Sequence, residues 1–217
     1  MVNDTQVLNN GYPMPSIGLG VYKITDEDME NVVNTAIETG YRAFDTAYFY
    51  GNEVALGKAL QNSGVDREDL FITSKLWNDY QGYDNTIEYF NQSLENLGLD
   101  YIDLFLIHWP CEKDGLYIES YKALEKLYDE GKVKAIGVCN FKQHHLEKLM
   151  EETEVVPQVN QIELHPYFNQ EDVQEFCDNH DIKVTAWMPL MRNRGLLDDP
   201  TIVDIAKRYD KTPAQIV

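Results

Sequence analysis

The sequence predicts an α/β fold, a TIM-type (β/α)8 barrel with about seven βα units present in the chain. Short apolar runs recur along the sequence, and their first residues lie about 23 to 32 residues apart. Each interval leaves room for one amphipathic helix, which is the βαβ pattern of a parallel sheet. No low-complexity linker or break in composition interrupts this pattern. We therefore expect one barrel domain over residues 1–217, incomplete at its C-terminal end.

The apolar runs are short and bounded by turn residues, as buried strands are. In chain order they are Ser16–Gly20, Arg42–Asp45, Leu70–Ser74, Ile102–Ile107, Lys134–Val138, Pro157–Ile162 and Lys183–Trp187. Ahead of them, Val7–Tyr12 predicts a two-residue hairpin with Asn10-Gly11 as a type I′ turn. We expect this hairpin to cap the base of the barrel.

Helical periodicity fills the intervals between the strands. In Asp84–Leu97 apolar residues recur three or four positions apart, and Tyr117–Glu130 repeats the pattern. Asp26 is the expected N-cap of an earlier helix, because acidic residues follow it in the first turn. Four glycines are suited to end helices as C′ residues: Gly40, Gly64, Gly98 and Gly131.

The C-terminal residues read as the start of another helix. Thr212 suits the N-cap and Pro213 the first helical position. A closed barrel of this type has eight strands. We therefore expect an eighth strand to follow Val217 in a longer parent protein.

Composition argues against several classes of protein. The formal net charge of −19 disfavours nucleic acid and anionic lipid as partners. No apolar run approaches the roughly 18 residues of a membrane span, and the first residues lack the features of a signal peptide. The cysteines, Cys111, Cys139 and Cys177, show no framework spacing, which favours reduced thiols and a cytoplasmic location.

Chemically active side chains stand at or just beyond three consecutive strand ends: Asp45, Tyr50, Lys75 and His108. In a parallel sheet these ends meet at the edge where barrels bind ligands. A phenol, with a pKa of about 10, is a weak acid, but a nearby ammonium lowers that pKa and a carboxylate keeps the ammonium charged. The set suits protonation of an oxygen during hydride transfer. Each residue alone also fits a structural role, and spacing does not separate Tyr50 from Tyr48.

Long stretches of the chain carry a family resemblance: Gly40–Gly57, Ile107–Pro110 and Gly131–Phe141. They resemble the aldo-keto reductase family, most closely its bacterial branch of 2,5-diketo-gluconate or glyoxal reductases. The resemblance extends over nearly the whole chain. It implies a (β/α)8 barrel that reduces aldehydes or ketones, of the small dicarbonyl or keto-sugar type, to alcohols with NADPH. By this match Tyr50 is the general acid, Lys75 and Asp45 tune it, and His108 orients the substrate.

The same resemblance assigns the cofactor contacts. The family's Ser-Asn pair and Gln, which hold the nicotinamide amide, are here Cys139, Asn140 and Gln161, and Trp187 matches the aromatic residue that stacks on the nicotinamide. The remaining cofactor positions implied by the match are Val21, Tyr22, Asp45, Met188 and Leu190. The implied substrate pocket is lined by Tyr22, Tyr48, Trp77, His108 and Trp109.

Two departures from the family pattern concern the cofactor. Met188 replaces a serine near the phosphates, and the motif that grips the adenosine 2′-phosphate would lie beyond Val217. The preference for NADPH therefore rests on the resemblance, with NADH as the alternative. A phosphate-bearing cofactor in so acidic a protein needs local cations, and the candidates are Lys75, Arg192 and Arg194.

Alternatives to an active reductase stay open. One alternative is a catalytically weak or non-enzymatic cofactor-binding barrel. The other is an incomplete fragment whose open sheet edge pairs with a second copy. The oligomeric state is also open, with a monomer expected at full length. No metal site is expected, because neither His144-His145 nor Cys177–His180 has a matching pair of ligands.

Overall fold

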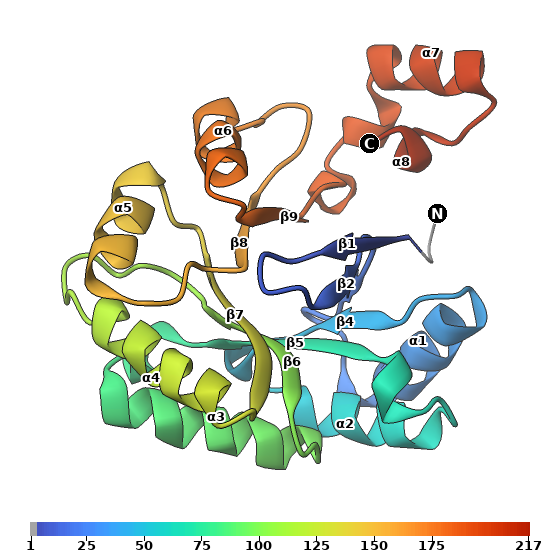
Figure 1. Cartoon of the computed structure of the whole chain (residues 1–217). Helices are drawn as coiled ribbons and strands as arrows, with labels where there is room; N and C mark the ends of the chain where they lie inside the picture. The colour runs from blue at the N-terminus through green and yellow to red at the C-terminus, as the bar shows by residue number, and fades with distance from the viewer. Residues whose placement is uncertain (1–3) are drawn as a thin grey trace.

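The computed structural model describes residues 4–217 and confirms the α/β barrel class (Figure 1). Within these residues, seven parallel strands form one curled sheet whose order follows the chain, as in a (β/α)8-type barrel. Its strands are β3 (Leu19–Gly20), β4 (Ala43–Asp45), β5 (Phe71–Leu76), β6 (Ile102–Ile107), β7 (Val133–Cys139), β8 (Val159–Glu163) and β9 (Lys183–Trp187). The edge strands of the described sheet are β3 and β9, which do not pair with each other.

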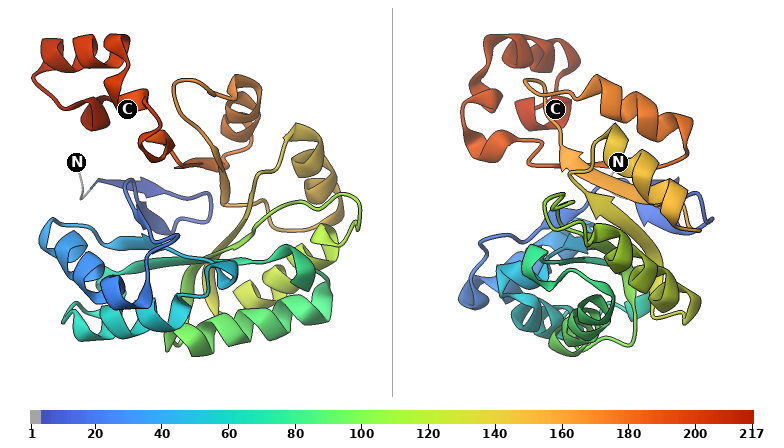
Figure 2. Two further views of the ribbon diagram at one scale, coloured as in Figure 1. Left: turned by 180° about the vertical axis from the view of Figure 1, so that it is seen from behind. Right: turned by 90° about the vertical axis from the view of Figure 1, so that its left-hand side faces the viewer.

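Six helices cover the outer face of the curled sheet (Figures 1 and 2): α1 (Asp26–Glu38), α2 (Glu53–Asn62), α3 (Tyr83–Leu97), α4 (Tyr117–Asp129), α5 (Gln143–Glu152) and α6 (Glu171–Asn179). Two more, α7 (Pro200–Tyr209) and α8 (Pro213–Ile216), follow β9, pack on each other and stand apart from the sheet in Figure 1. Short 3₁₀ helices lie between these elements: η1 (Tyr48–Tyr50), η2 (Arg67–Asp69), η3 (Asn78–Tyr80), η4 (Met191–Asn193) and η5 (Leu196–Asp198). None of the helices in residues 4–217 combines the length and apolar character that crossing a membrane needs.

The predicted helix ends are mostly confirmed. All four C′ glycines have positive φ, between 65° at Gly98 and 99° at Gly40. Thr212 caps α8, with Pro213 as its first residue. The prediction of Asp26 as N-cap is wrong by one residue: Thr25 holds that position and its hydroxyl accepts from the Asp28 N–H, while Asp26 starts the helix. The domain range 1–217 stays a prediction.

The N-terminal hairpin consists of β1 (Thr5–Val7) and β2 (Pro13–Pro15) in antiparallel register. The prediction of a two-residue type I′ turn is wrong. That turn needs positive φ at both central residues, and of Asn10 and Gly11 only Gly11 has one, at 85°. The connection is instead the longer loop Leu8–Tyr12.

The barrel has two apolar cores, one on each face of the sheet. The outer core lies between sheet and helices and includes Phe44, Phe105 and Leu124. The inner core joins the hairpin to the barrel interior, and its buried members are Leu8, Ala43, Phe71, Leu104, Leu106, Ala135, Cys139 and Val159. Because side chains alternate between the faces of a strand, this inner core determines which residues reach the interior at the carboxyl end of each strand.

Candidate active site

The side chains of the site lie on the same face of the strands as the inner core. Continuing from the inner positions of β4, β5 and β6 in steps of two gives Asp45, Lys75 and His108. The same steps on β8 and β9 give Gln161 and Trp187, since Val159 pairs with Lys183 and Glu163 with Trp187. All five therefore stand at the C-terminal mouth of the barrel.

Lys75 is the central charge of this site. Its side chain is 1% exposed, and its ammonium donates to Asp45 Oδ1 at 2.5 Å and to the Thr46 carbonyl at 2.8 Å. Burial is the largest effect and opposes the charge, but Asp45 and the other groups around the ammonium together outweigh it, and the pKa of Lys75 is raised. Gln161 donates to the other carboxylate oxygen, Asp45 Oδ2, at 2.8 Å. The lysine is thus held charged and in one place.

Tyr50 lies against this lysine. The Lys75 Nζ atom is 5.3 Å from the centre of the Tyr50 ring. The sequence predicts that Lys75 lowers the pKa of Tyr50, and the ammonium does act in that direction, but burial is the larger effect and the net pKa is raised. The Tyr50 hydroxyl accordingly keeps its proton at neutral pH. The phenolic proton has no acceptor among residues 4–217, and the charge beside the ring is the Lys75 ammonium, a donor, so this proton is free to be given away.

His108 completes the group. Its ring meets Tyr50 edge-on, with 5.9 Å between ring centres. Burial and then the Lys75 charge lower the pKa of His108 to about 3, so the ring is neutral at physiological pH. Across the described residues its Nδ1 atom is buried without a hydrogen-bond partner. A neutral imidazole with unpaired nitrogens can donate to a carbonyl oxygen that enters the mouth.

A second set of polar groups lies beside the tetrad of Asp45, Tyr50, Lys75 and His108. Asn140 takes the left-handed conformation (φ 63°), which asparagine tolerates better than most residues. Its amide donates to the His108 carbonyl at 3.0 Å, and its oxygen accepts from the Trp187 indole at 2.8 Å. Cys139 makes only a weak 4.0 Å contact to Gln161, and burial raises the pKa of its thiol.

Cations gather around Tyr22 instead of around Lys75. The Arg192 guanidinium lies 5.1 Å from the centre of the Tyr22 ring and the Lys23 ammonium 5.5 Å. The expectation that Lys75 serves cofactor phosphates is wrong, because its ammonium is buried against Asp45. Sequence reasoning missed Lys23. Its position beside the predicted cofactor residue Tyr22 was the available signal.

Aromatic side chains form the walls of the mouth. Tyr22 packs on Tyr50 with 4.7 Å between ring centres, and Trp77 meets His108 at 5.2 Å. Phe49, which the sequence analysis did not select, stacks on Trp77 at 3.8 Å. Trp109 is 41% exposed, and its carbonyl accepts from Gln81.

Several residues that the resemblance assigns lie elsewhere or outside the cluster. Tyr48 packs against Tyr80 and Tyr89, because residues two apart in a 3₁₀ turn point in different directions. The Val21 side chain belongs to the outer core and does not face the mouth. After β9, Met188 has a φ of 58° and Leu190 is 37% exposed, and the cofactor contacts of both stay predictions.

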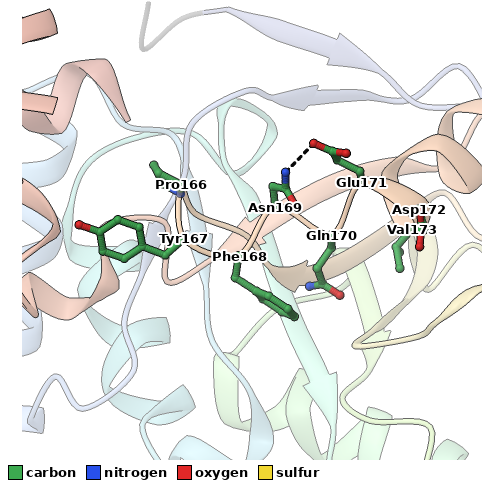
Figure 3. A pocket seen from close by; sticks show the side chains of 8 residues that line it. All are labelled: Pro166, Tyr167, Phe168, Asn169, Gln170, Glu171, Asp172 and Val173. Carbon is green, nitrogen blue, oxygen red and sulfur yellow. Dashed lines mark hydrogen bonds between the residues drawn. The ribbon is translucent and has the colours of Figure 1, made fainter. Parts of the chain in front are cut away.

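A surface hollow lies away from this chemistry, in the loop before α6. It has a volume of about 560 Å³ and is lined by residues of 166–173 (Figure 3). Within it the Asn169 amide donates to Glu171 at 2.6 Å. No residue of the tetrad lines it, so we assign it no catalytic role.

Glu112, His144 and His145 bring potential metal ligands within 4.8 Å of one another. The Lys142 backbone N–H donates to Nδ1 of His145 at 3.0 Å, which leaves the proton of a neutral ring on Nε2, facing Glu112. A ligating nitrogen cannot carry that proton. We therefore interpret the group as hydrogen bonds between α5 and the loop after β6, and still expect no metal.

Comparison with known proteins agrees with this geometry. The model of the Aldo/keto reductase family matches residues 16–216. The chain belongs to the aldo/keto reductase family. It is 50% identical over 215 residues to the uncharacterized oxidoreductase YtbE of Bacillus subtilis. This alignment covers 97% of this chain and 76% of that protein.

Two further relatives carry functional names. Glyoxal reductase of Bacillus subtilis is 48% identical over 217 residues, covering 100% of this chain and 78% of that protein. The crystal structure of a Gox0644 variant in complex with NADPH superposes with a TM-score of 0.94 at 44% identity. It covers 100% of this chain and 78% of that one. The family assignment identifies the chain as an oxidoreductase.

Proposed function

We propose that this protein reduces a small aldehyde or ketone, of the dicarbonyl or keto-sugar type, to an alcohol with NADPH. The observation that carries the proposal is the Tyr50 phenol, protonated and beside the buried Lys75–Asp45 pair at the mouth of the barrel. The similarity to glyoxal reductase and to an NADPH complex supports the substrate class and the cofactor.

The residues present fit a nicotinamide nucleotide. Asn140 anchors the indole edge of Trp187, which leaves the face of that ring for stacking. Asn140 and Gln161 supply amides beside it, and Lys23 and Arg192 place positive charge near Tyr22 for phosphates. The bound cofactor supplies a hydride to the carbonyl carbon. NADH is the alternative donor.

The chain's own residues act on the carbonyl oxygen. The neutral His108 imidazole donates a hydrogen bond that orients and polarises this oxygen. Tyr50 then gives its phenolic proton to the oxygen as negative charge develops there. Lys75 stabilises the resulting phenolate, and Asp45 keeps Lys75 in place. Tyr22, Phe49 and Trp77 exclude water from the mouth.

The test is consumption of C4-deuterated NADPH by the chain with methylglyoxal, together with the position of the deuterium in the product. We expect transfer to the carbinol carbon, and a rate roughly 10²- to 10⁴-fold lower in Tyr50→Phe. Tyr89→Phe makes the same change in a ring that stacks on Tyr80 outside the site, and should retain the rate. Wild-type turnover in Tyr50→Phe, or no transfer to any of a panel of carbonyls, would overturn the proposal.

We also propose a cytoplasmic location, because Cys111, Cys139 and Cys177 are all free thiols. The expected partner is the small carbonyl substrate, and no nucleic acid or membrane partner is proposed. A monomer is proposed for the full-length protein. Sedimentation of the full-length protein would test that state, and a dimer of the 217-residue chain alone would favour pairing through the open edges of the sheet.

A further inference from the structure

Asn52 is a buried side chain whose bonds do not serve the helix that it starts. It occupies the N-cap of α2, a position where an asparagine usually accepts from a backbone N–H of the first turn. Here its side chain makes no such bond, although it is only 3% exposed. The Asn52 side chain makes its hydrogen bonds to other segments instead.

The partners of Asn52 lie on the two segments that flank the catalytic residues. The Asn52 amide donates to the Val21 carbonyl at 2.9 Å, and its oxygen accepts from the Thr46 hydroxyl at 2.7 Å. Val21 and Thr46 are both completely buried. Among the described residues the Thr46 hydroxyl has no other hydrogen-bond partner, so this bond is costly to lose, whereas the Val21 carbonyl also accepts from the Ile24 N–H at 3.1 Å.

These bonds close a ring around the Lys75–Asp45 pair. The Thr46 carbonyl accepts from the Lys75 ammonium at 2.8 Å, and the Val21 N–H donates to the Asp45 carbonyl at 2.9 Å. Lys75 and Asp45 close the ring through their ion pair. Asn52 therefore connects the two backbone segments that hold the catalytic charges.

Asn52 is also close to the proton donor along the chain. Gly51, in the left-handed conformation at φ 69°, is the single residue between Tyr50 and Asn52. On the other side, Tyr22 follows Val21 and packs on the Tyr50 ring. A shift of Asn52 therefore moves Tyr50 relative to both Lys75 and Tyr22.

We propose that Asn52 is a positioning residue of the reduction, which fixes the Tyr50 phenol relative to the Lys75 ammonium. This inference rests on the proposed function of the site. Asn52 touches no reacting atom, and acts through Thr46, Val21 and the Gly51 turn. Its role is separate from helix capping, because its side chain makes no capping bond.

The test compares Asn52→Ala with the matched control Gln158→Ala. Gln158 is 2% exposed and lies just before β8, at the opposite end of that strand from Gln161; its oxygen accepts from the Ile136 N–H at 2.8 Å and its amide donates to the Val156 carbonyl at 3.0 Å. We expect Asn52→Ala to lower kcat roughly 10- to 100-fold with KM little changed. Gln158→Ala should lower the melting temperature and leave kcat unchanged. Thr46→Val, which is isosteric, removes only the hydroxyl bond and should lower kcat less.

A second readout needs no turnover. Carbon-13 NMR of protein labelled at tyrosine Cζ, with the Tyr50 signal assigned by its loss in Tyr50→Phe, reports the pKa of that phenol. We expect this pKa to rise in Asn52→Ala, because Lys75 then stabilises the phenolate less. The inference is overturned if kcat and the Tyr50 pKa both match wild type in Asn52→Ala and Thr46→Val. A wild-type protein without activity would refute the proposed function alone, since the NMR measurement would still decide the placement of Tyr50.

Discussion

Each end of the barrel holds a cluster of a carboxylate, a cation and a tyrosine, and the two clusters differ in which of these groups contact each other. The C-terminal cluster is Asp45, Lys75 and Tyr50, and the N-terminal cluster is Asp103, Arg67 and Tyr12. In the N-terminal cluster the tyrosine bonds directly to the carboxylate, with Tyr12 donating to Asp103 Oδ1 at 2.7 Å. In the C-terminal cluster the lysine lies with the carboxylate, and the tyrosine contacts the lysine.

This difference in order decides which protons are available. Arg67 and the Ile72 N–H both donate to Asp103 Oδ2, at 2.6 and 2.8 Å, so with Tyr12 three donors hold the N-terminal carboxylate. Burial and the hydrogen bond to Asp103 raise the pKa of Tyr12, whose proton is committed. Tyr50 instead faces a donor, and its proton is uncommitted. The N-terminal cluster connects the hairpin to the barrel through Tyr12, and the C-terminal cluster can donate a proton from Tyr50.

Asp103→Asn should have the largest effect on stability. The substitution removes the charge that compensates Arg67, and it offers the donors of Arg67 and Ile72 a weaker acceptor. We expect a loss of roughly 3 kcal/mol in the free energy of unfolding. This is the lower end of the range for breaking a buried ion pair, because Arg67 is 23% exposed. Urea unfolding measures it. A reduced kcat at unchanged stability would remove the distinction between the clusters.

The pH dependence of stability tests the buried His108. The unfolded chain binds a proton near pH 6.5, whereas folded His108 binds one only at about 3. The contribution of the neutral His108 ring to the free energy of unfolding is therefore complete above pH 6.5. It is lost as the pH falls from 6.5 towards 3, by roughly 1–2 kcal/mol at pH 5. His108→Gln should flatten this slope, and His180→Gln, at an exposed position, should not. Equal slopes in all three proteins would contradict a neutral buried ring.

Tyr12→Phe should show the smallest effect. It removes one hydrogen bond to Asp103 while Arg67 and Ile72 keep theirs, so we expect a loss of about 1 kcal/mol. The turnover number should be unchanged, because this ring lies at the opposite end of the barrel. Chemical denaturation and the NADPH assay on the same sample provide the measurement. A fall in kcat would show that the two ends are coupled.

Sequence patterns predicted the features that depend on local geometry or on strand ends. The glycine helix stops were correct because positive φ is a local requirement, and Asp45, Lys75 and His108 were found because parallel strands end at one edge. Thr25 and Asp26 were confused because both residue types cap well. Tyr48 was assigned to the pocket by the family resemblance, and spacing does not separate it from Tyr50 because it carries no information on the direction of a 3₁₀ turn.

Features that depend on contacts between distant segments were not predictable. Tyr12 and Asp103 are 91 residues apart, and nothing in either local sequence indicates that they bond. The same holds for Asn52 and Val21, which are 31 residues apart. Such pairs form only once the inner core has closed the hairpin and the strands around it.

The central claim is that one cluster serves chemistry and the other stability. The direct test is Lys75→Met beside Arg67→Met, with kcat and the free energy of unfolding measured for both. Lys75→Met should lower kcat roughly 10²-fold or more, with little loss of stability because Asp45 is 25% exposed and keeps Gln161. Arg67→Met leaves Asp103, 1% exposed, without its cation, and should cost roughly 3 kcal/mol at unchanged kcat. Loss of activity in Arg67→Met, or an active Lys75→Met, would contradict the account.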